Sequence, residues 1–180
     1  MISKTVIEVK EFERILKRIA LQIIEKNINR IESLAFIGIR KRGVPLAKRL
    51  ASYIKNTEGY DIPVGELDIS LYRDDQTAIS NEPILSGTEI DFSFSGKNLI
   101  IIDDILQSGK TARAAMEAIL DHGRPESIEL GVIVDTRTRT LPMSADYYGK
   151  RLPISKKEFV RLNLKEFDQK DSIEIIKRGE

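Results

Sequence analysis

Short apolar runs alternate along the chain with longer stretches that are apolar on one side only. Leu34–Ile39, Leu99–Ile102 and Ser127–Val134 are runs with little polar alternation, as expected of strands that a parallel sheet buries on both faces. In Lys10–Asn27, by contrast, apolar residues recur at the spacing of one helix face. Because such strands and helices alternate, the pattern predicts an α/β fold with a mostly parallel central sheet flanked by helices.

Shorter elements complete this prediction, and one domain over residues 1–180 is expected from the length. A second helix runs through about Ile54, and a third ends near His122, before Gly123. The remaining strands are predicted from short apolar or alternating stretches: Thr5–Val9, Val64–Tyr72, Glu89–Phe94, Ala145–Tyr148, and two edge strands at Phe159–Leu164 and Ile173–Ile176.

The most informative stretch is NLIIIDDILQSGKTARAA, residues 98–115. Asp103 and Asp104 follow its apolar run, at the carboxyl end of a strand, where open α/β sheets bind ligands. A small polar loop then leads into a helix whose first amide groups lack partners and favour an anion. A phosphate in the loop and ribose hydroxyls or a divalent cation at the two carboxylates would together fit a sugar phosphate. The loop consists of Gln107, Ser108, Gly109, Lys110 and Thr111.

This stretch has two other possible interpretations. Ser108–Thr111 ends like a phosphate-binding P-loop, but that motif requires glycine five residues before Gly109, where this chain has Asp104. A carboxylate at that point argues against a P-loop NTPase. The other interpretation is an ordinary buried strand followed by a charged turn.

A second anion site is predicted where Leu34–Ile39 ends. Arg40, Lys41 and Arg42 stand between a strand and a helix, and Gly43 permits close approach of the backbone. A solvated basic turn is the alternative. Residues 73–87 lack periodicity, which favours a functional lid over the two anion sites, with a disordered insertion as the other interpretation.

Composition excludes several classes of site. The formal net charge is +1, so any attraction to nucleic acid must come from a local patch. There is no cysteine and only one histidine, which excludes disulfides, thiolate metal sites and histidine triads. His122 is expected to complement a helix C-terminus. No stretch suits a signal peptide or membrane span, so a cytoplasmic protein without membrane partners is expected.

The stretch IIIDDILQSGKTARAA closely resembles the phosphoribosylpyrophosphate (PRPP) signature of type I phosphoribosyltransferases. Further blocks, such as GIRKRGVPLAKRLA, VGELDISLYRDD and ADYYGK, resemble one branch of that family. That branch combines uracil phosphoribosyltransferase activity with regulation of pyrimidine operons. The resemblance implies the type I phosphoribosyltransferase fold, with a flexible lid and a small hood.

The resemblance also implies roles for the residues already named. Asp103 and Asp104 would engage the ribose hydroxyls and Mg²⁺, and residues 107–111 would hold the 5′-phosphate. Arg40–Gly43 would bind pyrophosphate, with Arg40 also counted as catalytic. The lid would begin at Tyr72, Arg73, Asp74 and Asp75, and Asp135 with Arg137 would lie near the base or metal.

The implied reaction is displacement of pyrophosphate from PRPP by uracil, giving UMP, in a homo-oligomer that also responds to UMP- or UTP-type nucleotides and binds an mRNA leader. Alternatives are a mainly RNA-binding attenuator with weak catalysis, and a phosphoribosyltransferase for another base. Where the branch typically has Arg-Gly-His-Arg-Glu after Asp135, this chain has Thr-Arg-Thr-Arg-Thr. Candidate RNA contacts are Arg14, Lys17, Arg18, Lys26, Arg139 and Lys150; a solvated helix face is the other interpretation for those between residues 14 and 18.

Overall fold

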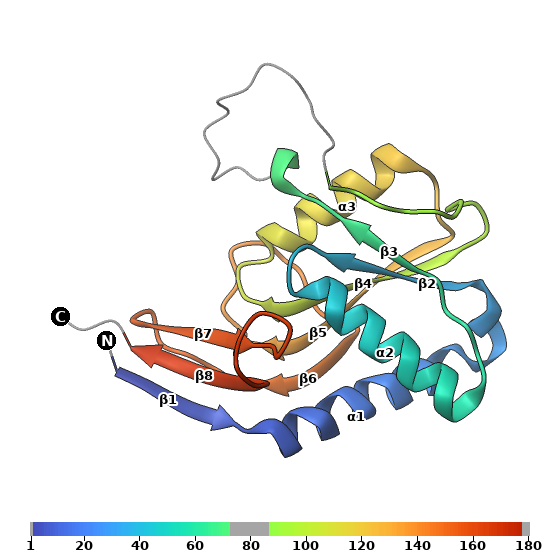
Figure 1. The fold of residues 1–180 in the computed structure, drawn as a ribbon. Coiled ribbons are helices and arrows are strands. Elements are labelled where there is room, and N and C mark those ends of the chain that lie inside the picture. Colours follow the sequence, from blue (N-terminus) through green and yellow to red (C-terminus); the bar gives the residue numbers. More distant parts are fainter. Residues whose placement is uncertain (1, 73–86, 178–180) are drawn as a thin grey trace.

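A five-stranded parallel sheet forms the centre of the computed structural model, which describes residues 2–72 and 87–177. The strand order is β3-β2-β4-β5-β6 (Figure 1). The expected α/β fold with a mostly parallel central sheet is therefore confirmed. The strands are β2 (Leu34–Ile39), β3 (Val64–Leu67), β4 (Asn98–Leu106), β5 (Ser127–Asp135) and β6 (Tyr147–Arg151).

Helices cover both faces of this sheet. In Figure 1, α1 (Val9–Asn27) and α2 (Gly43–Glu58) lie on one face and α3 (Lys110–His122) lies on the other. Successive strand residues point to opposite faces, so Ile100 and Ile102 of β4 pack with α1 and α2, whereas Leu99 and Ile101 pack with α3. The apolar runs of the sequence are continuous because both faces of these strands are covered.

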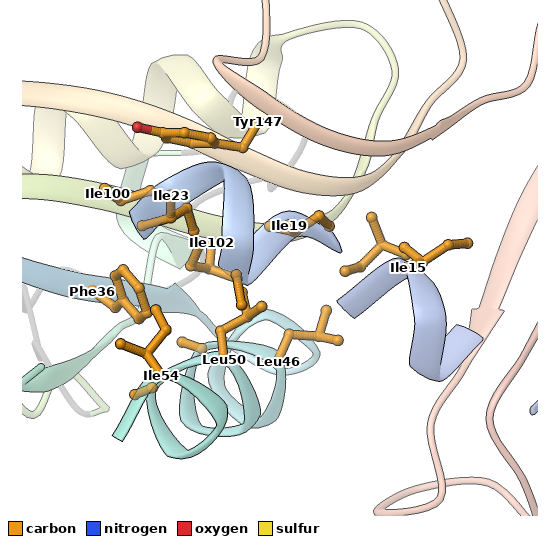
Figure 2. Close-up of a cluster of buried hydrophobic side chains, with 14 of the residues drawn as sticks. Ile15, Ile19, Ile23, Phe36, Leu46, Leu50, Ile54, Ile100, Ile102 and Tyr147 are labelled. Atoms are coloured by element: carbon orange, nitrogen blue, oxygen red, sulfur yellow. The ribbon is translucent and has the colours of Figure 1, made fainter. Parts of the chain in front are cut away.

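The larger apolar cluster forms between the sheet and the first two helices. Figure 2 shows Ile19 and Ile23 of α1 and Leu50 of α2 around the sheet residue Ile102, with Ile15 further along α1. These α1 residues are spaced four apart, so one helical stripe is buried while the opposite face is exposed. The helix predicted at Lys10–Asn27 is confirmed, with Val9 as its first residue.

A glycine directly follows the last residue of α2 and of α3. The second helix continues one turn past the expected end at Ile54, because Gly59 stops it with a left-handed φ of 79° and donates its N–H to the Lys55 carbonyl at 3.0 Å. The third ends as predicted, and His122 Nδ1 lies 2.9 Å from the Ala118 carbonyl oxygen.

A separate three-stranded antiparallel sheet has the order β1-β8-β7. Its strands are β1 (Ile2–Ile7), β7 (Glu158–Asn163) and β8 (Ser172–Lys177). Together with the segment 164–171, these strands form what we call the hood. Figure 1 shows it beside the end of the central sheet toward which the β2 and β4 arrows point. The prediction that Ile173–Ile176 is an edge strand is wrong, because β1 pairs with its outer side; β7 is an edge strand as predicted.

Several shorter predictions need correction. The strand expected at Val64–Tyr72 ends at Leu67, since the carboxylate of Asp68 accepts the Ser70 N–H at 2.9 Å and turns the chain into a 3-10 helix at Ser70–Tyr72. The strand expected at Glu89–Phe94 is wrong, since only an isolated bridge joins Glu89 to Glu66. The strands expected at Thr5–Val9 and Ala145–Tyr148 occupy shifted bounds, as β1 and β6. Within the described ranges, no helix is long and apolar enough to cross a membrane.

Candidate active site

The residues predicted to bind ligand gather where the direction of strand addition reverses. From β2 the chain adds β3 on one side, then crosses to add β4, β5 and β6 on the other. Ligands of open α/β sheets bind at the carboxyl ends of strands beside such a switch point. The register places Gly38 of β2 beside Ile102 of β4 and Asp103 beside Val132 of β5, so the loops after these strands meet at one edge.

Asp103 and Asp104 lie within the last part of β4, which extends to Leu106 rather than ending at Ile102 as expected. Both side chains are half-buried. Asp103 Oδ1 accepts the Asp104 N–H at 2.9 Å, and Asp104 Oδ1 accepts the Ile105 N–H at 2.7 Å. Burial raises the pKa of Asp104 above its ordinary range, although the Ile105 N–H and the nearby charge of Arg42 favour its ionised form.

The loop after β4 presents the start of α3. Gly109 has a φ of 90°, a left-handed conformation suited to glycine, and directly precedes the first helical residue, Lys110. The hydroxyl of Ser108 accepts the Lys110 N–H at 3.3 Å. Loop, strand end and helix start line a cavity of about 180 Å³, which includes Asp103 and Thr111. The five residues from Gln107 to Thr111 thus lie between the end of β4 and the start of α3, and their role as an anion loop stays a prediction.

A second loop, after β5, is hydrogen-bonded to the loop at residues 107–111. Asp135 is buried, and its Oδ1 accepts the Arg137 N–H at 2.9 Å and Arg139 Nη2 at 2.6 Å. Arg139 Nη1 also donates to the Gln107 carbonyl at 2.9 Å, and the N–H groups of Thr140 and Leu141 donate to the Ser108 carbonyl at 3.0 Å. Asp135 thus lies beside the loop after β4, its role near the base or metal stays a prediction, and Arg139 is occupied by these bonds.

The predicted pyrophosphate loop, Arg40–Gly43, packs tightly against β4. A Cβ on Gly43 would overlap the carbonyl oxygen of Ile102, so only glycine fits at this point. The peptide bond between Arg40 and Lys41 is cis. Arg40 Nη2 forms ion pairs with Glu66 at 3.0 Å and Glu89 at 3.1 Å, which directs its guanidinium toward β3. The hydrogen bond from Lys48 favours the ionised form of Glu66 more strongly than burial opposes it. The pKa of Glu66 is therefore lowered.

Arg42 turns the other way, toward the hood. Its Nε donates to the Leu162 carbonyl at 2.8 Å, and its Nη2 lies 3.2 Å from Asp168 Oδ2. Arg42, Asp104 and residues 159–163 of β7 line a cavity of about 440 Å³. The sequence prediction missed β7 and Asp168 as site residues, because no local motif marks the hood and only the tertiary fold carries it to the end of β4.

Of the predicted lid residues, only Tyr72 belongs to the described part of the chain; Arg73, Asp74 and Asp75 lie outside it. The Tyr72 hydroxyl donates to Asp121 Oδ2 at 2.8 Å, and this hydrogen bond raises the pKa of Tyr72. This hydrogen bond thus joins the 3-10 helix at Ser70–Tyr72 to α3.

The six candidate RNA contacts differ in whether other residues of the protein already engage them. Arg14 and Lys17 are exposed on α1, and the structure shows neither in an ion pair with another described residue. Arg18 donates to the Gly149 carbonyl, and Lys150 pairs with Glu11 at 3.1 Å. Lys26 pairs with Glu129 at 3.1 Å, at the far end of α1.

Comparison with known proteins identifies the class to which this fold and site belong. The family model for the phosphoribosyl transferase domain matches residues 4–166. The chain is 52% identical over 161 residues to the "Bifunctional protein PyrR" of Alkaliphilus metalliredigens, which covers 89% of this chain and 88% of that protein. It is 46% identical over 171 residues to the protein of the same name from Deinococcus radiodurans, covering 95% and 93%. The chain belongs to the phosphoribosyltransferase family and, within it, to the branch of the bifunctional PyrR proteins.

A solved structure supports the fold. The hypoxanthine phosphoribosyltransferase of Trypanosoma cruzi superposes with a TM-score of 0.74 at 18% identity, covering 98% of this chain and 97% of that one. The predicted type I phosphoribosyltransferase fold and the predicted enzyme class are confirmed.

Proposed function

We propose that this chain transfers the phosphoribosyl group of PRPP to uracil, forming UMP and pyrophosphate. The observation that carries the proposal is the meeting of three features at one switch point: the Asp103–Asp104 pair, the start of α3 and the Arg40–Gly43 loop. They offer, side by side, oxygen ligands, an anion-binding helix start and a basic loop. PRPP has a matching set of groups in its ribose, 5′-phosphate and pyrophosphate.

In this proposal the residues act mainly by positioning and by electrostatics. The amide groups at the start of α3, with Ser108, Thr111 and Lys110, hold the 5′-phosphate. Asp103 and Asp104 accept hydrogen bonds from the ribose hydroxyls. Residues 40–43 receive the pyrophosphate: Gly43 brings the loop backbone against β4, while Lys41 is exposed and adds positive charge.

The two carboxylates also fit a magnesium ion. Mg²⁺ prefers hard oxygen ligands and is commonly held by one or two carboxylates together with substrate phosphates and water. Asp103 and Asp104 are adjacent, half-buried carboxylates with this chemistry. A bound Mg²⁺ would supply stabilisation of the charge that develops on the leaving pyrophosphate.

The base is assigned to the cavity between Arg42, Asp104 and β7. β7 is the edge strand of the hood, and antiparallel strands direct alternate residues' backbone groups outward. Because the Leu162 carbonyl accepts a bond from Arg42, the backbone of Leu162, and by alternation that of Val160, is directed away from β8. An outward N–H and C=O of Val160 would pair with one carbonyl and the N3–H of uracil. Asp135 and Arg137 keep a role near the base or metal in this proposal.

The test is release of pyrophosphate from PRPP with Mg²⁺, offering uracil, hypoxanthine, guanine, adenine and orotate separately. Release only with uracil supports the proposal. Release with another base would keep the enzyme class and overturn the base. No release with any base, although PRPP or UMP binds, would favour a protein that mainly binds RNA under nucleotide control.

Site variants sharpen this test. Asp103→Asn and Asp104→Asn should each lower kcat/KM for PRPP by at least about 100-fold, because lost charge weakens transition-state stabilisation. Asp61→Asn is the matched control, since Asp61 is exposed and pairs only with Lys55 among the described residues. If both site variants kept wild-type turnover, the assignment of the two aspartates would be wrong.

The second part of the proposal is regulation through an mRNA leader. Its support is the exposed pair Arg14 and Lys17, with Arg18 beside them on α1. The chain would act in the cytoplasm as one domain, without membrane partners, with UMP- or UTP-type nucleotides as effectors. A homo-oligomer would join the α1 faces of two copies, because one short basic stripe offers little area to RNA.

A further inference from the structure

Arg42 connects two parts of the site that are far apart in sequence. Its backbone belongs to the Arg40–Gly43 loop, which the contact of Gly43 with Ile102 fixes against β4. Its guanidinium reaches the hood, where Nε donates to the Leu162 carbonyl at 2.8 Å and Nη2 lies 3.2 Å from Asp168 Oδ2. The Phe167 ring centre is 5.8 Å from the guanidinium carbon. One side chain therefore joins the predicted pyrophosphate loop to the wall of the cavity assigned to the base.

Asp168 is built to hold this side chain. Its Oδ2 accepts the Leu164 N–H at 2.9 Å, and its own N–H donates to the Leu164 carbonyl at 2.6 Å. The carboxylate is therefore fixed within a closed turn, directly after β7. Since Arg42 and Asp168 are each only about one-third exposed, their charge-assisted contact is partly shielded from water and salt.

From this arrangement we propose that Asp168 is a positioning residue, which acts through Arg42 to couple the base cavity to the pyrophosphate loop. The inference rests on the proposed function. Asp168 sets the rotamer of Arg42, so the Leu162 carbonyl is held at the cavity wall while the loop keeps one conformation. Occupation of the cavity by the base of UMP then stabilises the arrangement that also binds pyrophosphate.

A neighbouring contact provides a matched control. Glu166 lies in the same segment and binds Arg49 of α2, which also pairs with Asp171. This pair docks the hood onto α2 and lies outside the cavity lined by Arg42 and Asp104, whereas the Arg42–Asp168 pair docks the hood onto the loop before α2. Glu166→Gln therefore reports the cost of loosening the hood without disturbing Arg42.

The experiment measures binding of pyrophosphate with Mg²⁺ by calorimetry, with and without saturating UMP, for the wild type, Asp168→Asn and Glu166→Gln. Asparagine keeps an oxygen for the Leu164 N–H but loses the charge that holds Arg42. In Asp168→Asn the enhancement of pyrophosphate affinity by UMP should fall by about tenfold, as expected for loss of one charge-assisted bond. Glu166→Gln should keep the wild-type enhancement. Equal losses in the two variants, or no loss in Asp168→Asn, would overturn the inference.

Kinetics and a second variant separate this inference from the proposed function. With uracil as substrate, Asp168→Asn should raise KM for uracil by about tenfold and change kcat by less than about threefold. Arg42→Lys keeps the charge but loses the forked geometry of the guanidinium, so UMP should enhance pyrophosphate affinity as weakly as in Asp168→Asn. Adding Asp168→Asn to the Arg42→Lys variant should cause no further loss. An Arg42→Lys variant in which UMP still enhances pyrophosphate affinity as much as in the wild type would overturn the inference. If the wild-type protein bound UMP and pyrophosphate but showed no turnover, the proposed catalysis would be wrong. The coupling between UMP binding and pyrophosphate binding would still be measurable.

Discussion

Arg139 donates to the buried carboxylate of Asp135 at 2.6 Å and, with its other terminal nitrogen, to the Gln107 carbonyl at 2.9 Å. Its Nε also donates to the Met143 carbonyl, at 2.8 Å. The side chain thus ties the end of β5 to the predicted phosphate loop after β4. A residue that the sequence suggested as an RNA contact is committed to bonds within the protein.

We therefore predict that Arg139→Gln lowers stability and weakens PRPP binding. Loss of a mostly buried, charge-assisted brace should cost about 2 kcal/mol, or roughly 4–8 °C in Tm for a chain of this size. KM for PRPP should rise, because the Gln107 carbonyl loses the donor that holds it in place. Thermal unfolding and initial-rate kinetics measure both effects. An unchanged Tm, with only the salt dependence of RNA binding reduced, would instead make Arg139 a phosphate contact.

The packing of Gly43 predicts a strong response to a single methyl group. In Gly43→Ala the new Cβ would meet the Ile102 carbonyl oxygen, which is fixed in the centre of the sheet. We expect destabilisation of about 3 kcal/mol or more and loss of pyrophosphate binding, since the loop must move away from β4. Gly59→Ala is the control: Gly59 has a φ of 79° but open space around it, so only about 1 kcal/mol of backbone strain is expected. Denaturant unfolding of both variants measures the difference, and equal costs would contradict the packing argument.

Glu129 gives a prediction that depends on pH. Its side chain is 13% exposed. Burial opposes its ionisation, but the Tyr147 hydroxyl at 2.7 Å, Lys26 and Arg30 outweigh burial and lower the pKa of this carboxyl. A lowered folded-state pKa contributes stability above the unfolded pKa, which is lost as pH falls through the folded value.

Glu129→Gln should therefore cost about 2 kcal/mol at pH 7, and the difference from wild type should shrink below about pH 4. The exposed Glu126, changed to Gln, is the matched control and should show little effect at either pH. Thermal unfolding across this pH range measures the effect. A difference that stayed constant down to pH 2 would show that the charge of Glu129 is not its source.

The exposed pair on α1 tests the proposed regulatory role. The double variant Arg14→Gln, Lys17→Gln should weaken binding of the RNA leader without changing Tm, because neither side chain forms an ion pair with the other described residues. The slope of log K against log salt should decrease by roughly 0.7 for each lost phosphate contact. Lys150→Gln provides a contrast, since Lys150 already pairs with Glu11. Unchanged affinity and slope in the double variant would place the RNA elsewhere.

Local pattern was sufficient to predict the central sheet, its helices and the position of the loops proposed to bind anions. Leu34–Ile39 and Lys10–Asn27 carry the periodicity of a doubly buried strand and of a one-sided helix, so their packing partners need not be known. The order of apolar run, two aspartates, small polar loop and helix likewise determined the candidate PRPP site, because each part is contiguous in sequence.

Only the tertiary structure decided how distant segments combine. β1 pairs with β8 across almost the whole chain, which made Ile173–Ile176 a central strand rather than an edge. The same hood carries Leu162 and Asp168 to Arg42, and no local signal connects residues about 120 positions apart. Likewise, Arg139 lies in a basic stretch that looks solvated in sequence, yet its acceptors are Asp135, the Met143 carbonyl and the Gln107 carbonyl of the loop after β4. The charge of a side chain can be read from the sequence. The group that pairs with this side chain depends on which chain segments the fold brings together.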